Sequence, residues 1–465
     1  MKVTFIIPSI GRKDNERYIK TMKVTFIIPS VGKKDNERYI KTWQMEPLSI
    51  AQLAGLTPDS IEMQFFDDRL EQIKYDEPTD LVAISVETYT ARRAYQISTI
   101  YRKKGIKVIL GGFHPTLIPE EAIEYADSVL IGEAEGLWNK VLQDVEDNKL
   151  KKFYKSDVRF SLDGLRPNRD IFNGKKYLPL SLVESARGCS FMCNFCSVSS
   201  FYKQAYKCRP ISEVVKEIKD LKRENIFLID DNIGVNRTRT KELFEALTSC
   251  NVRWIGQISI NLLKDDELVS LMAKSGCICV LIGFESLDSH NLEQMNKSWN
   301  NKSAYEEVVQ KLRDKGIVMY ATFLFGYDYD NLDSFNRVLE FTLKHKFFLV
   351  AFNHLIPFPG TALYEKLYNE GRILHDRWWL DSDYRFGDIP FQPKNFSPQE
   401  LSELCLNFRK KFYSFPSILR RSIDYKANCK NIHMLSTFFS LNLLLKKEVM
   451  QRYGLPIGKI NHNMI

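Results

Sequence analysis

From Lys23 onward, short apolar runs alternate with amphipathic stretches of helical length. This alternation is typical of βαβ units and parallel sheets, which places the chain in the α/β class. In the first part of the chain we expect strands at 24–29, 61–66, 81–86, 107–112 and 128–133, with helices at 47–56, 91–104, 118–125 and 135–146. These elements predict a doubly wound, Rossmann-like domain whose ligands bind beyond the carboxyl ends of the strands.

The alternation stops at a charged, irregular segment and then resumes. We expect further strands at 180–186, 226–231, 252–260, 278–284, 317–325 and 349–356, with helices at 211–223, 238–249, 265–275, 303–315, 332–345 and 361–371. These elements make six βα units, whereas a closed barrel of this type has eight. The second domain is therefore predicted to be an open, partial barrel.

The domain boundaries follow from these two series and from a duplication at the N-terminus. Residues 1–21 recur almost unchanged at 22–42. A stacked repeat array needs at least three copies, so we interpret the first copy as a passenger and Met22 as the start of the first domain. The predicted segments are 1–21 passenger, 22–146 first domain, 147–178 linker, 179–374 partial barrel and 375–465 a mainly helical C-terminal region.

Composition limits the classes of protein that fit the chain. Nine cysteines are scattered through it and no secretory signal is apparent, so we expect a reduced, cytoplasmic protein. A net charge of +8 over 465 residues gives no reason to expect a nucleic-acid partner. The longest apolar run, Met434–Leu445, is too short to span a bilayer. It either packs on the barrel or, with the basic residues around it, contacts an anionic membrane surface or a lipid-like substrate.

Three cysteines follow the first strand of the predicted barrel in the segment RGCSFMCNFCSV. Cys189, Cys193 and Cys196 lie at the face where such barrels bind their ligands. Three clustered thiolates suit a 4Fe–4S cluster whose fourth iron is open to a substrate or cofactor. The alternative is a structural zinc ion with Cys208 as fourth ligand, but a structural zinc is uncommon where a barrel binds its substrate.

This cysteine spacing after the first strand of a six-unit barrel resembles the radical S-adenosylmethionine superfamily. The resemblance implies that the open iron binds S-adenosylmethionine and that reductive cleavage yields a 5′-deoxyadenosyl radical. Phe195, just before the third cysteine, matches the position that stacks on adenine in that family. Such chemistry needs a cavity from which water is excluded.

Polar residues at other strand ends are further candidates for binding S-adenosylmethionine. Asp230 and Asn232 follow the second barrel strand, and Ser259 ends the third. Glu285 ends the fourth in the segment GFES, and the resemblance implies that it accepts hydrogen bonds from ribose hydroxyls. Asp230 is alternatively a helix N-cap, and Ser259 alternatively faces the substrate.

His354 ends the sixth barrel strand and is the candidate there for contacting the substrate or donating a proton. A lone histidine in such a position is more often a structural hydrogen-bonding residue.

The first domain resembles the cobalamin-binding domain of class B radical S-adenosylmethionine methyltransferases, through the strand-end segments SVETYT, GGFHPT and GEAEG. The DxHxxG loop that supplies a cobalt ligand in other corrinoid domains is absent, so we predict cobalamin bound without a histidine ligand. His114 would then line the corrin side or cap a helix. The candidate cobalamin contacts are Thr88, Gly111, Gly112, His114, Thr116, Gly132 and Glu133. Each is alternatively a turn or capping residue in a domain that holds no cofactor.

Together these features predict a cobalamin-dependent radical enzyme, with a methyltransferase acting on an unactivated carbon as the leading hypothesis. It would take a small-molecule or lipid-like substrate and an electron from a flavodoxin- or ferredoxin-type donor. One alternative is an oxidative cyclase or a carbon–carbon bond-forming enzyme acting on a tetrapyrrole or lipid. Another is a metal- or cobalamin-binding protein without catalysis.

Overall fold

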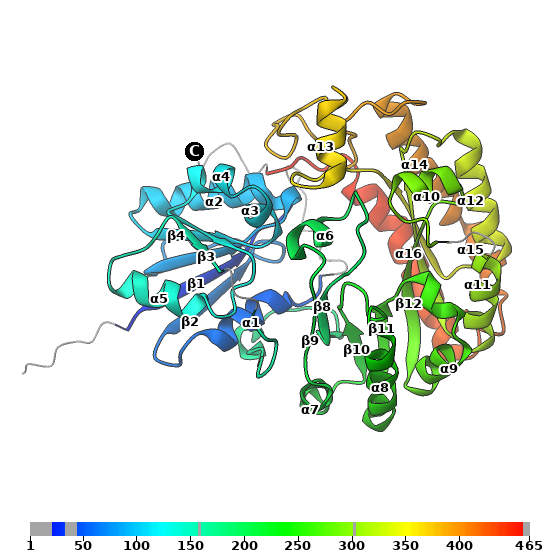
Figure 1. Cartoon of the computed structure of the whole chain (residues 1–465), viewed down its shortest axis with the longest axis horizontal. Helices are drawn as coiled ribbons and strands as arrows, with labels where there is room; N and C mark the ends of the chain where they lie inside the picture. Colours follow the sequence, from blue (N-terminus) through cyan, green and yellow to red (C-terminus); the bar gives the residue numbers. More distant parts are fainter. Residues whose placement is uncertain (1–20, 33–43, 157–159, 301–303, 459–465) are drawn as a thin grey trace, which may run out of the picture.

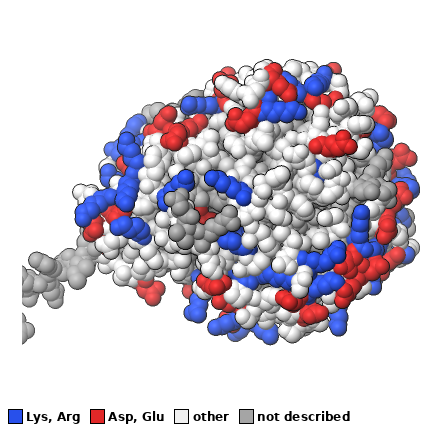
Figure 2. Space-filling view, viewed as in Figure 1, with Lys and Arg blue, Asp and Glu red and all other residues white. Residues whose placement is uncertain are grey.

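A computed structural model describes residues 21–32, 44–156, 160–300 and 304–458. Two lobes stand side by side, and each is built around its own parallel sheet (Figure 1). Nearly all of the duplicated segment 1–21 lies outside the described residues. On the face shown in Figure 2, acidic and basic side chains are interspersed and form no extended region of one sign.

The first lobe contains six parallel strands in the order β2-β1-β3-β4-β5-β6. They are β1 Lys23–Ile28, β2 Glu62–Asp67, β3 Leu81–Ser85, β4 Lys107–Gly111, β5 Ser128–Ile131 and β6 Phe153–Lys155. Five of them lie where the apolar runs predict. The sixth, β6, pairs with β5 and falls inside the segment 147–178 that we expected to be a linker.

Helices cover both faces of this sheet, so its central strands are buried on both sides (Figure 1). This explains why β3 is a continuous apolar run rather than an alternating one. The helices are α1 Leu48–Leu56, α2 Ala91–Lys103, α3 Phe113–Leu117, α4 Pro119–Ala122 and α5 Trp138–Glu146, with short 3-10 turns η1 Thr88–Thr90 and η2 Ile123–Tyr125.

The second lobe is an open parallel sheet of six strands in the order β14-β13-β12-β11-β10-β7, as the count of βα units predicts. Its strands are β7 Ser181–Val183, β10 Asn225–Leu228, β11 Arg253–Gln257, β12 Cys277–Glu285, β13 Val318–Phe325 and β14 Leu349–His354. The first predicted strand, 180–186, is divided. Only β7 joins the sheet, while β8 Ala186–Gly188 pairs antiparallel with β9 Tyr206–Cys208.

The helices of this lobe alternate with its strands. They are α6 Ser197–Tyr202, α7 Ile211–Leu221, α8 Arg237–Leu247, α9 Asp266–Lys274, α10 Ser289–Gln294, α11 Tyr305–Asp314, α12 Leu332–Lys344 and α13 Ala362–Asn369, with 3-10 turns η4 Thr248–Cys250 and η5 Ile260–Lys264. The 3-10 turn η3 Arg169–Phe172 precedes β7 and packs on the first lobe. Side-chain caps fix several starts. At α12, Asn331 accepts from the Ser334 amide while the Ser334 hydroxyl accepts from the Asn331 amide.

The C-terminal region belongs to both lobes. Its helices α14 Pro398–Phe412, α15 Phe415–Ser422 and α16 Ile432–Arg452 pack on the barrel and share its core (Figure 1). Trp378 and Trp379 instead pack into the core of the first lobe. The last described residues also return there, where the Gly458 amide donates to the Val31 carbonyl at 2.9 Å.

A buried carboxylate, Glu121, ties this C-terminal segment to the first lobe. It accepts hydrogen bonds from Tyr95 Oη at 3.0 Å and Trp379 Nε1 at 2.9 Å, and its Oε1 lies 3.2 Å from His114 Nε2. Burial opposes ionisation of Glu121, but the hydrogen bonds from His114 and Trp379 outweigh it and lower the pKa. The ionised carboxylate therefore contributes to stability.

Glu121→Gln is expected to lower the free energy of unfolding by about 1–3 kcal/mol, because one acceptor becomes a donor in a buried network. Since the pKa of Glu121 is lowered on folding, its contribution is lost as pH falls through the folded-state pKa. Thermal unfolding between pH 7 and pH 3 should show the difference from wild type shrinking at the acid end. Glu124→Gln, an exposed neighbour, is the control. Equal midpoints for the two variants would contradict this account.

Candidate active site between the two sheets

A cavity of about 730 Å³ lies between the lobes, at the carboxyl ends of the strands of the first sheet. Gly111, Gly112, Gly132 and Glu133, all predicted cobalamin contacts, line it. Residues that the sequence did not single out line it as well, among them Gln52, Glu87, Thr90, Arg187 and Tyr202. This is the edge at which doubly wound sheets bind their ligands.

The other three predicted cobalamin contacts lie beneath the surface of this cavity. His114 is fully buried, with Nδ1 3.3 Å from Thr88 Oγ1 and Nε2 3.2 Å from Glu121. Burial lowers the pKa of His114 despite that carboxylate. Thr116 Oγ1 accepts from the Gly132 amide at 2.9 Å. These side chains position the strand-end loops. His114 was predicted to line the corrin side or to cap a helix, and it does not line this cavity.

The cavity fits a large planar cofactor in volume and in backbone conformation. Its volume falls within the roughly 300–1,000 Å³ of cofactor pockets. Gly132 has φ 88°, and a Cβ there would meet no protein atom within 4 Å. A ligand can therefore approach the backbone at Gly132. At Gly112, with φ 102°, a Cβ would instead meet the backbone of Val86, so this glycine serves the packing of β4 beside β3.

The three cysteines of the predicted cluster lie on one loop, between β8 and α6. In the part of the chain that the structure describes, they are not arranged as a ready set of metal ligands. All are free and partly buried, and their thiols act on one another electrostatically. Burial raises the pKa of Cys193 to about 12, so its thiolate needs a compensating positive charge such as iron supplies. Cys208, the fourth ligand of the zinc alternative, lies in β9 and interacts with Tyr206 instead.

Two of the residues predicted to bind S-adenosylmethionine meet beside this loop. Asn232 Nδ2 donates to Ser259 Oγ at 2.7 Å and lies 3.9 Å from the Cys189 sulfur. Asp230, also predicted to bind S-adenosylmethionine, instead contacts Ser185. Its buried carboxylate accepts from the amide and hydroxyl of Ser185 at 2.6 and 2.5 Å, and burial raises its pKa to about 6.

Asp230 therefore positions the segment that leads to the cysteines. The N-cap role considered for it is wrong, because Asn236 caps α8. Its contact with S-adenosylmethionine stays a prediction.

Glu285 lies at the end of β12, close to the cysteine loop. It is buried, with φ 61° in the left-handed region, and pairs with Lys297 at 2.7 Å. Burial alone would lower the pKa of Lys297, but Glu285 and the thiol of Cys193 raise it. Lys297 was missed from the sequence, since only the fold brings its ammonium group to Glu285 and the cluster loop.

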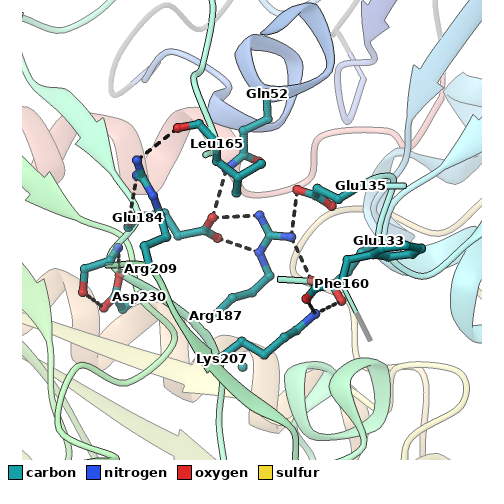
Figure 3. Close-up of polar contacts among 12 residues, drawn as sticks. Gln52, Glu133, Glu135, Phe160, Leu165, Glu184, Arg187, Lys207, Arg209 and Asp230 are labelled. Carbon is teal, nitrogen blue, oxygen red and sulfur yellow. Dashed lines mark hydrogen bonds and ion pairs between the residues drawn. The ribbon is translucent and has the colours of Figure 1, made fainter. Parts of the chain in front are cut away.

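Arg187 joins the lobes through a buried ion cluster (Figure 3). Its Nη1 contacts Glu133 at 2.9 Å and Glu135 at 3.0 Å, both from the loop after β5. Its Nη2 donates to Glu184 of the second lobe at 2.7 Å. The carboxylate of Glu133, which also pairs with Lys207, is thus engaged by the other lobe.

A second cavity, of about 430 Å³, lies between the inner face of the barrel and helices α14 and α16. Phe195 of the cysteine loop lines it, as does His354. Phe386 and Arg452 line both cavities, so the two spaces adjoin each other there. The site thus contains a strand-end cavity in the first lobe, a cysteine loop, and a second cavity next to both.

Both lobes match known protein families. Residues 183–342 match the Radical SAM superfamily, and residues 45–141 match the B12 binding domain. Bacteriochlorophyllide d C-12(1)-methyltransferase of Chlorobaculum tepidum is 31% identical over 388 residues, covering 81% of this chain and 84% of that protein. The chain belongs to the cobalamin-dependent radical S-adenosylmethionine family.

Two further relatives agree with this assignment. Bacteriochlorophyllide d C-8(2)-methyltransferase of the same organism is 28% identical over 428 residues, covering 87% of this chain and 93% of that protein. The solved structure of OxsB, a cobalamin-dependent S-adenosylmethionine radical enzyme, has the same fold, with a TM-score of 0.65 at 13% identity over 93% of this chain and 72% of that one. The predicted radical methyltransferase with a 4Fe–4S cluster, S-adenosylmethionine and cobalamin is confirmed at the level of the family.

Arg187→Met is expected to lower the free energy of unfolding by about 3–5 kcal/mol, because it leaves buried carboxylates without their cation. Arg253→Met is the matched control, since Arg253 pairs with Glu224 on the surface, where such pairs contribute about 1 kcal/mol or less. Urea unfolding followed by tryptophan fluorescence checks both variants. Similar losses in the two proteins would show that the Arg187 cluster does not hold the lobes together.

Proposed function

We propose that the protein transfers a methyl group to an unactivated carbon of a small molecule with a largely apolar body. The observation that carries the proposal is the contact of the two cavities at Phe386 and Arg452. One cavity has the features of a cobalamin site, and the other contains Phe195 of the cluster loop. A substrate in the second cavity would therefore lie close to both cofactors.

In the proposed reaction each lobe holds a different cofactor. Cys189, Cys193 and Cys196 would hold the cluster, and the strand-end loops around Gly132 would hold cobalamin. When bound, the cofactors supply a 5′-deoxyadenosyl radical and a transferable methyl group. Asn232, Ser259, Glu285 and Phe195 would orient S-adenosylmethionine. An external flavodoxin- or ferredoxin-type protein would supply the electron.

The proposal is tested with anaerobically reconstituted Cys193→Ala protein. This variant should lack the visible absorption of the cluster and should form no 5′-deoxyadenosine. Cys429→Ala is the control, because this half-buried cysteine lies far along the chain between α15 and α16. Formation of 5′-deoxyadenosine by Cys193→Ala would contradict the assignment.

Product mass separates methyl transfer from the alternative outcome. In methyl transfer a C–H hydrogen of the substrate leaves with 5′-deoxyadenosine and a C–CH₃ bond replaces it, so the product gains one CH₂. An oxidative cyclisation loses hydrogens instead. Mass spectrometry of metabolites and lipids from cells with and without the gene distinguishes the two.

We further propose that α15 and the start of α16 contact an anionic membrane surface. Phe415, Leu419 and Ile423 recur every four residues and are 58%, 58% and 57% exposed. Tyr425 and Ile432 extend this apolar surface. Lysines and arginines surround it, whereas the single carboxylate between residues 410 and 447 is buried and paired with Arg313. Such a surface suits anionic lipid headgroups. Among the described helices, none is long and apolar enough to cross a membrane.

Leu419→Asp is expected to weaken binding to phosphatidylserine-containing vesicles about tenfold, because inserting a leucine side chain contributes roughly 1.5–3 kcal/mol. Leu332→Asp is the matched control, since Leu332 is 54% exposed at the start of α12. Vesicle flotation measures both proteins. Equal binding by the two variants, or no binding by wild type, would overturn this proposal.

A further inference from the structure

We propose that the second cavity is the substrate pocket, and that Arg409 in its wall selects a substrate whose apolar body carries a carboxylate. This inference rests on the proposed methyl transfer and adds the chemical class of the substrate. It also gives a role to the charged side chains in the wall of the second cavity.

The cavity has an apolar end near the cofactors. Phe195 approaches it from the cluster loop, and Phe358 and Phe386 line it beside Tyr89. Tyr89 packs against Phe358 and Phe386, with ring centroids 6.0 and 5.2 Å apart, so these three side chains form a continuous aromatic wall. An unactivated carbon of the substrate belongs at this end, because Phe195 and Phe386 connect it to the cysteine loop and to the first cavity.

Another part of the cavity wall carries charge, and through Arg452 it reaches the junction with the first cavity. Arg409 extends from α14, and its Nη2 donates to the Phe352 carbonyl at 2.8 Å and to Asn353 Oδ1 at 3.0 Å. These bonds hold the guanidinium against the edge strand β14. Within the described part of the chain, Arg409 forms no ion pair, although the carboxylate of Glu448 acts on it electrostatically. Its buried Nε has no hydrogen-bond partner there. A positioned guanidinium that forms no ion pair favours a carboxylate on the ligand.

The groups next to Arg409 leave this part of the cavity wall with a net positive charge. Arg452 pairs with Glu448 at 2.5 Å, while the second carboxylate oxygen of Glu448 is buried without a partner among the described residues. His354 is neutral, since burial and the nearby Arg409 lower its pKa to about 3. The two arginines therefore outnumber the one carboxylate. Of the three roles considered for His354, contact with the substrate fits its place in the cavity wall, where its buried Nε2 has no hydrogen-bond partner among the described residues. Donating a proton from an imidazolium does not fit a neutral side chain.

The size of the cavity agrees with such a ligand. A volume of about 430 Å³ is within the range of small-molecule pockets. A fully neutral hydrocarbon would leave the Arg409 guanidinium desolvated and unpaired, which is unfavourable. An amphipathic acid would place its carboxylate at Arg409 and its apolar body along the aromatic wall.

The test compares two probes that differ only in this group, 4-(1-pyrenyl)butyrate and 4-(1-pyrenyl)butanol. Calorimetric titration of anaerobic holoenzyme should show the acid binding at least about tenfold more tightly than the alcohol, as a charge-assisted hydrogen bond predicts. Arg409→Met should abolish this preference and leave binding of the alcohol unchanged. Lys410→Met, which removes an exposed cation from the next position of α14, should keep the preference.

A second variant keeps the test decisive if Arg409→Met fails to fold. Glu448→Gln removes the one negative charge and should tighten binding of the acid severalfold, without affecting the alcohol. Equal affinities of the two probes in wild type would overturn the charge selection, and binding of neither would overturn the pocket. Both outcomes are independent of 5′-deoxyadenosine formation, so they are distinguishable from a failure of the proposed reaction.

Discussion

The guanidinium of Arg187 is buried among three carboxylates, and two of these, Glu133 and Glu135, come from the other lobe. Taking these charges out of water is costly, and only close pairing offsets the cost. The lobes cannot separate or rotate without exposing unpaired charges inside the interface. The strand ends of the first sheet are therefore held facing the mouth of the partial barrel.

The C-terminal region also holds the two lobes together. Trp378 and Trp379 pack into the core of the first lobe, while α14 and α16 pack on the barrel. The same region supplies Phe386 and Arg452, the residues common to the two cavities. The two proposed cofactor sites on separate sheets thereby adjoin each other, which a reaction involving a radical and a methyl donor requires.

Features that depend on local order were predictable from the sequence. The period of apolar residues predicted the two parallel sheets, and the spacing of Cys189, Cys193 and Cys196 predicted the cluster. Side-chain direction was not predictable in the same way. His114 and Thr116 lie at the expected strand end, but they bond to Glu121 and to the Gly132 amide beneath the cavity.

Features that depend on the contact between lobes left no signal in the sequence. Arg187 follows a barrel strand and Glu135 follows a strand of the first sheet, and nothing local to either indicates that they meet. Strand β6 was missed because it is only three residues long and lies in a charged segment. Its pairing is supplied by the neighbouring strand β5 rather than by a periodic pattern of its own.

In the proposed arrangement, the cluster and cobalamin share one continuous site. Electron paramagnetic resonance of reduced holoenzyme that contains both the paramagnetic cluster and cob(II)alamin is the decisive measurement. We expect the two signals to be broadened or split by their mutual magnetic interaction, and the cobalt signal of Cys193→Ala protein to lack this effect. A spectrum equal to the sum of two isolated centres would show that the two cofactors do not share a site.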